Sequence, residues 1–219
     1  MPVATEGHLH LGLPSENAPG TTLLRLVADF RREYPRVRCS LAFGSLPTIQ
    51  EELIAERLSF ALVDQSSDHD FIEAVTVGER RDVLVATRRY VEEHGPFAST
   101  QALGLADVIL TAGEEVWPGL AVTPEAAAVV PCHAAALTLA AAGGGVALVP
   151  AELAAEHVAA GTVVTLTPGG FAPPPRPRHL LYRKRSARQL FESLFLEFFL
   201  DAAGVTPPPS HGVGRRQAS

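Results

Sequence analysis

The chain has 219 residues, 47% of them hydrophobic, and a formal net charge of −6. This length and composition suit one large domain or two small ones. The acidic balance argues against broad nucleic-acid binding, and no apolar run approaches the roughly 20 residues that span a bilayer. The N-terminus lacks the basic start and apolar core of a secretory signal, so we expect a cytoplasmic protein with no membrane segment.

The first third of the sequence alternates between strand and helix patterns. Period-two alternation or continuous apolar runs predict strands around residues 9–13, 37–43 and 60–63. Apolar residues at helical spacing predict helices between them, at about 22–34 and 47–54. The resulting β-α-β-α-β order indicates a parallel sheet with helical crossovers.

The middle of the chain contains a second α/β unit. Strands are predicted at 82–86, 108–110, 129–130, 146–149 and 163–166, with helices at 134–142 and 151–159 and a short helix or turn at 88–94. Gly143, Gly144 and Gly145 follow a helix and precede a strand, which is the reverse of the order in a dinucleotide-binding loop. We therefore interpret these glycines as a helix C-cap and tight turn.

The end of the chain is marked by a change in composition. Residues 167–178 are rich in Pro and Gly, which predicts a linker. A strand at 179–182 and a helix at 187–200 follow, and the remaining Pro, Gly, Ser and Arg residues predict a disordered tail over 201–219.

Four of these segments together resemble the effector-binding domain of LysR-type transcriptional regulators. They are GHLHLG at 7–12, LLRLVADFRREYP at 23–35, GSLPTIQEELIAERLSFALVD at 44–64, and the A-G-x-G-[IV]-A-x-[LV]-P pattern followed by a glycine at 142–161. Their order and spacing make the match specific, and it covers roughly residues 7–200.

The resemblance implies an α/β fold of two Rossmann-like subdomains joined by crossover strands, similar to type 2 periplasmic binding proteins. Subdomain I would comprise 7–80 plus 170–200, and subdomain II 81–169. It also implies a small-molecule effector in the cleft between them, and a homodimer. The family's helix-turn-helix and linker helix have no counterpart here, so we expect either that a DNA-reading module was removed or that the natural protein has none.

Ligands of parallel α/β sheets bind at the carboxyl ends of strands and near helix N-termini. The loops in those positions supply the candidate ligand-binding residues Ser15, Glu16, Asn17, Ser45, Thr48, Thr111, Cys132 and His133. Ser45 and Thr48 have the alternative role of capping their helix. A carboxylate at Glu16 would repel an anionic ligand and argues against a simple organic acid.

Catalytic signatures such as G-x-S-x-G, H-E-x-x-H and a P-loop are missing from the sequence. His8 and His10 lack a third metal ligand at a suitable spacing, and adjacent Cys132 and His133 cannot face each other on a helix. We therefore expect no catalytic residue, metal or cofactor. The alternative is a stand-alone protein that uses the same cleft as a carrier or as an enzyme pocket.

Overall fold

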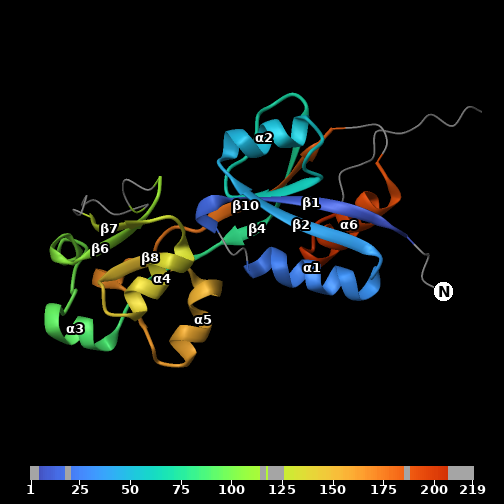
Figure 1. Cartoon of the computed structure of the whole chain (residues 1–219). Helices are drawn as coiled ribbons and strands as arrows, with labels where there is room; N and C mark the ends of the chain where they lie inside the picture. Colours follow the sequence, from blue (N-terminus) through green and yellow to red (C-terminus); the bar gives the residue numbers. More distant parts are fainter. Residues whose placement is uncertain (1–4, 18–20, 114–116, 118–125, 185–187, 207–219) are drawn as a thin grey trace, which may run out of the picture.

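The computed structural model describes residues 5–17, 21–113, 117, 126–184 and 188–206. In these residues the secondary structure forms two α/β lobes, each built on its own sheet (Figure 1). This confirms the predicted α/β class. Two lobes form because the hydrophobic residues divide into separate cores, one pair of core clusters on the faces of each sheet.

Lobe one contains the five-stranded sheet β2-β1-β3-β10-β4 of the described residues. Its strands are β1 (Gly7–Pro14), β2 (Val37–Gly44), β3 (Phe60–Val63), β4 (Ile72–Arg80) and β10 (Arg176–Arg183). The strand β1 pairs in parallel with β2 and β3, as the sequence predicts, whereas β10 is antiparallel to both β3 and β4. The return of the chain through β4 and β10 makes the sheet mixed.

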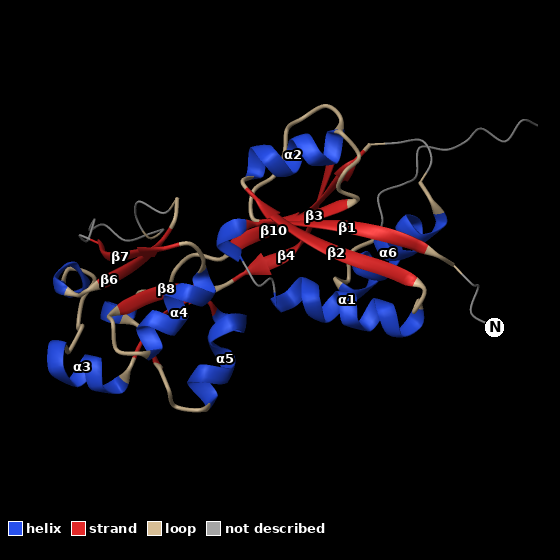
Figure 2. Cartoon of the chain, viewed as in Figure 1, coloured by secondary structure: helices blue, strands red, loops and turns tan. Residues whose placement is uncertain are grey.

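Helices cover both faces of this sheet (Figure 2). They are α1 (Thr21–Glu33) and α6 (Leu190–Ala202) on one face and α2 (Leu46–Ile54) on the other. The alternation in β1 explains the division, because Leu9, Leu11 and Leu13 all point toward α1 and α6. On the opposite face, Ile49 and Leu53 of α2 pack with Leu181 of β10.

Lobe two contains a second five-stranded sheet in the described part of the chain, with the order β7-β6-β8-β5-β9. Its strands are β5 (Asp82–Ala86), β6 (Val108–Thr111), β7 (Ala126–Val130), β8 (Val146–Pro150) and β9 (Val164–Leu166). The helices α3 (Arg88–His94), α4 (His133–Ala141) and α5 (Ala151–Ala159) complete the lobe, with short 3-10 turns elsewhere at η1 (Ser15–Asn17), η2 (Ala102–Leu105) and η3 (Pro168–Gly170).

The glycines after α4 form a structural turn, as predicted. Gly143 and Gly145 have φ values of +87° and +134°, in the region that L side chains rarely adopt. A Cβ atom on Gly145 would lie 2.0 Å from the carbonyl oxygen of Asp107. Position 145 therefore requires glycine, because its backbone lies directly against Asp107, the residue that precedes β6.

Two connections join the lobes. The first passes from β4 to β5 through Arg81 alone, and the second runs over 167–175, between β9 and β10. The strand β4 is not among the predicted elements, and the predicted linker is wrong in extending to 178, since β10 begins at Arg176. Pro177 is tolerated in β10 because its paired neighbour there is β4 alone, β3 pairing only with 179–181.

The C-terminal helix runs slightly further than predicted. It continues through Asp201 and Ala202 and is followed by Gly204 with φ +67°, whereas the predicted tail begins at 201. Residues 207–219 of that predicted tail lie outside the described residues. Among the described helices, none combines the length and apolar character needed to cross a membrane.

Candidate ligand-binding cleft

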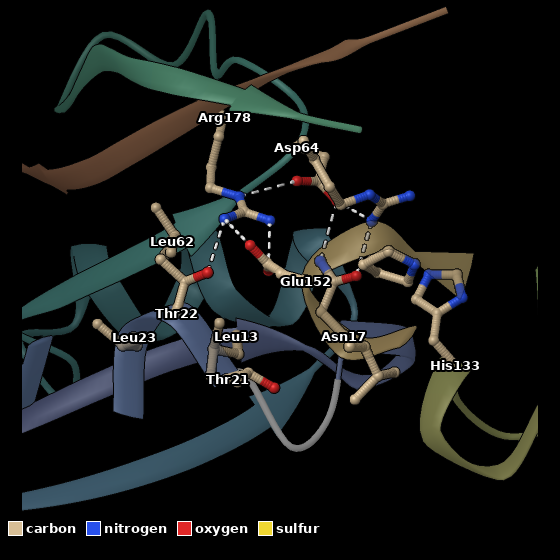
Figure 3. A pocket seen from close by; sticks show the side chains of 13 residues that line it. Leu13, Asn17, Thr21, Thr22, Leu23, Leu62, Asp64, His133, Glu152 and Arg178 are labelled. Carbon is tan, nitrogen blue, oxygen red and sulfur yellow. Dashed lines mark hydrogen bonds and ion pairs between the residues drawn. The ribbon is translucent and has the colours of Figure 1, made fainter. Parts of the chain in front are cut away.

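A cavity of about 30 Å³ lies where the two lobes meet. Lobe one lines it with the ends of β1 and β3, the start of α1, and side chains from β4 and β10. Lobe two contributes His133 of α4 and Pro150, Glu152 and Leu153 around the start of α5. Figure 3 shows these side chains converging from both lobes. The cavity is therefore an interlobe site.

Arg178 of β10 makes the contact that crosses the cavity. Its Nη2 donates to Oε1 of Glu152 at 3.0 Å, and its Nη1 donates to Oε2 at 3.4 Å (Figure 3). The same Nη1 donates to Oγ1 of Thr22 in α1 at 3.1 Å. One guanidinium thus ties the first turn of α5 in lobe two to β10 and α1 in lobe one.

A β-bulge in β4 lies opposite Arg178. The register between β10 and β4 shifts between Arg178 and His179, opposite Gly78, whose φ is +140°. The extra residue belongs to β4, because Arg178 and His179 are consecutive in β10 whereas their partners Gly78 and Thr76 are two residues apart. Because Arg176 and Arg178 are two residues apart on one strand, both side chains emerge on the same face, toward the cavity and the first crossing.

Arg80, at the end of β4, forms the buried centre of the site. It pairs with Asp82 through two contacts of 2.9 Å and also contacts Asp64. Its Nη1 donates to Oδ1 of Asn17 at 2.8 Å, and the Nδ2 of Asn17 donates to Asp64 at 2.9 Å. Only 2% of the Arg80 side chain is exposed. These mutual contacts satisfy charged groups that burial would otherwise strongly disfavour.

The ion pairs of the site balance in charge. Three arginines (Arg80, Arg176 and Arg178) contact three carboxylates (Asp64, Asp82 and Glu152). Burial by itself would raise the pKa of Glu152, but hydrogen bonds from Arg178 and Thr22 and the charges of Arg178 and Arg80 lower it overall. Glu152 is therefore held as a carboxylate against Arg178.

Two of the predicted ligand-binding residues line the cavity. Asn17 ends the 3-10 turn η1 after β1, and His133 begins α4 with a side chain that is only 2% exposed. The turn η1 and the helix α4 are in contact with each other across the lobes. The structure thus brings together residues that are far apart in the sequence, one from each lobe.

The other six predicted residues are not among those that line the cavity. Ser15 and Glu16 precede Asn17 in η1, and Cys132 is the N-cap of α4 without a side-chain capping bond. Ser45 caps α2, its Oγ accepting from the backbone N–H of Thr48. Thr111 is 1% exposed at the end of β6.

The charged residues that dominate the site were not predicted from the sequence: Asp64, Arg80, Asp82, Glu152, Arg176 and Arg178. Two signals for them were present. Gly78 follows the β-branched run Val75-Thr76-Val77, and a glycine inside a strand pattern is typical of a β-bulge. Arg176 and Arg178 show strand alternation inside the supposed linker. In the described residues, no group of three or more His, Cys, Asp or Glu side chains is arranged to hold a metal ion.

Known proteins of one family share this two-lobed architecture. The model of the LysR substrate binding domain matches residues 4–204. No curated protein sequence matches the chain. Among solved structures, the regulatory domain of CrgA, a LysR-type transcriptional regulator from Neisseria meningitidis, has a TM-score of 0.77 at 20% identity, covering 91% of this chain and 100% of that one.

Two further structures share the fold. The regulatory domain of AphB from Vibrio vulnificus has a TM-score of 0.72 at 16% identity, covering 91% of this chain and 100% of that chain. The effector-binding domain of QuiR, solved in complex with shikimate, has a TM-score of 0.69 at 18% identity, covering 91% and 98%. With its two α/β lobes, two crossings and interlobe cavity, this chain belongs to the LysR substrate-binding domain family.

Proposed function

We propose that this chain senses a small-molecule effector in the cleft between its lobes, as the regulatory part of a LysR-type regulator. The single observation that carries the proposal is the cavity lined by polar side chains of both lobes, among them Asn17, His133 and Arg178. A ligand that touches both lobes favours the lobe arrangement in which both sets of contacts are made. Binding energy is thereby converted into a change of shape.

The size of the cavity indicates how the ligand enters. Ligand pockets usually have volumes of about 300–1,000 Å³, whereas this cavity measures about 30 Å³. A ligand must therefore part the lobes, and we propose that residues 7–80 with 170–200 move as one unit and 81–169 as the other. In the wider cleft, Asn17 and His133 are proposed contacts, together with the predicted residues around them: Ser15, Glu16, Ser45, Thr48, Thr111 and Cys132.

The same proposal covers the setting of the protein. We propose a cytoplasmic homodimer in which this chain makes no direct contact with nucleic acid, in line with its formal net charge of −6. The ligand class is suggested by analogy alone: the effector-binding domain of QuiR binds shikimate, a small polar molecule. An enzyme or carrier that uses the cleft is the competing function.

A thermal-shift screen of small metabolites, with shikimate as the first compound, tests the proposal. A ligand that binds only the native state raises the melting temperature by an amount that grows with the logarithm of its concentration relative to Kd. The increase should shrink in Asn17→Ala and His133→Ala and persist in Ser40→Ala, a control on β2 outside the cavity lining. Equal increases in all variants would place the binding site elsewhere. Consumption of a bound compound over time would favour the enzyme.

A further inference from the structure

The two partners in the Arg178–Glu152 ion pair differ in how firmly they are held. The Arg178 side chain is 12% exposed, whereas that of Glu152 is 37% exposed. Arg178 also contacts Thr22 and Asp64, both in its own lobe. Glu152 belongs to the other lobe, lies in the first turn of α5 and lines the cavity. Rotation of the Glu152 side chain into water would therefore leave the arginine in place.

The guanidinium of Arg178 presents two N–H donors to the two oxygens of one carboxylate. This paired geometry suits any carboxylate that enters the cavity, and charge-assisted pairs of this kind are stronger than neutral hydrogen bonds. A carboxylate ligand could replace Glu152 without leaving the buried arginine unpaired. A neutral ligand would have to break the ion pair and leave the Arg178 charge less well compensated, which is costly at a buried site.

We propose that Glu152 is a built-in competitor of the effector: it occupies Arg178 in the ligand-free protein, and the carboxylate group of the effector takes its place. This inference rests on the proposed function, because it names the ligand class of the same cleft. Glu16, the predicted source of repulsion against an organic acid, is not among the residues that line the cavity around Arg178, so in the wider cleft it would face a part of the ligand other than the carboxylate. The carboxylate that lines the cavity is that of Glu152, and its side chain can rotate away from Arg178 into water.

The exchange also explains how ligand binding is coupled to movement of the lobes. Glu152 is carried by lobe two and Arg178 by lobe one, so their contact ties the lobes together across the cavity. A ligand carboxylate that replaces Glu152 breaks the ion pair between the lobes as it binds. The effector then substitutes its own contacts for the internal one, and the preferred separation of the lobes changes.

Acetate is the simplest probe of the arginine, with acetamide as its uncharged analogue. We would follow the Nε–Hε resonance of Arg178, assigned by its loss in Arg178→Lys, at constant ionic strength in the full chain. The variants are Glu152→Gln, which removes the competing charge, and Glu156→Gln, an exposed control one turn further along α5. Acetate should shift the resonance in Glu152→Gln at a concentration about tenfold or more below that for the unchanged protein.

The expected result includes a Glu156→Gln titration that matches the unchanged protein, and no shift with acetamide in any variant. The inference is overturned if acetate acts at the same concentration with and without Glu152, or leaves Arg178 unshifted in Glu152→Gln. It also fails, while the proposed function stands, if the metabolite screen yields a cleft ligand without a carboxylate. If acetate competes with Glu152 but no metabolite binds, the proposed function fails instead.

Discussion

Arg80 and Asp82 form a two-pronged ion pair on either side of Arg81, the one residue of the first connection between the lobes. The Nη2 and Nε atoms of Arg80 lie 2.9 Å from the two carboxylate oxygens of Asp82, and each side chain is 2% exposed. Arg80 ends β4 in one sheet and Asp82 begins β5 in the other. The ion pair therefore holds the end of β4 against the start of β5 at the first connection between the lobes.

Asp82→Asn should strongly destabilise the protein. Removing the Asp82 charge leaves the three arginines of the site with only two carboxylates, and an unbalanced buried charge costs about 3–5 kcal/mol in the free energy of unfolding. Urea unfolding measures this loss. The matched control is Glu93→Gln, which breaks the exposed Arg89–Glu93 pair on α3 and should change stability far less. Equal losses in the two variants would contradict a structural role for the Arg80–Asp82 pair.

Gly145→Ala should destabilise lobe two. The new Cβ would lie 2.0 Å from the Asp107 carbonyl oxygen, at a φ of +134°. Backbone strain together with this overlap is expected to lower the free energy of unfolding by about 2–4 kcal/mol. Gly161→Ala is the control, since its φ is +71° but no atom lies within 4 Å of the added Cβ. It should lose about 1 kcal/mol from strain alone, as measured by chemical denaturation.

Tyr90→Phe should weaken the packing of α3 on lobe two. The Tyr90 hydroxyl donates to Oδ2 of Asp107 at 3.0 Å and accepts from the Asp107 backbone N–H at 2.8 Å. Loss of both bonds leaves a partly buried N–H without this acceptor, which costs about 1–3 kcal/mol. Thermal unfolding and faster hydrogen exchange at the Asp107 amide would report it. An unchanged exchange rate at that amide would show that the hydroxyl does not protect it.

Stability should fall in acid partly through Glu152. Burial opposes the shift, but Arg178 and Thr22 lower the pKa of Glu152 in the folded protein below its ordinary value of 4.5. A lowered carboxyl pKa contributes stability that is present above the unfolded value and is lost as pH falls through the folded value. The unfolding free energy of Glu152→Gln should therefore depend less steeply on pH below 4.5, as urea titrations at successive pH values would show. Identical slopes would contradict the prediction.

Local patterns were sufficient to predict most of the elements. The leucines of β1, the apolar stripe of α1 and the continuously apolar β3 occur where the sequence indicates them. The strand β4 was missed because its two faces differ little in burial, so period two is weak over 72–80. The start of β10 was missed because Pro177 and its neighbours have the composition of a linker.

The candidate site could be predicted only in part. Asn17 and His133 were found because loops after parallel strands and before helices face ligand sites in such sheets. Arg178 and Glu152 are 26 residues apart and carry no local signal of their pairing. Charged residues on a strand and on a first helical turn are ordinarily solvated, so their types and spacing gave no reason to connect them.

The sequence by itself determined the α/β class, the glycine turn before β8 and the family to which the chain belongs, because periodicity, turn residues and motif order are local properties. Only the tertiary structure decided how the cleft is filled. The two crossings bring Arg80, Arg178 and Glu152 to one place, and burial there makes each charge depend on the others. These charged residues are far apart in the sequence, so their contacts form only when the two lobes come together.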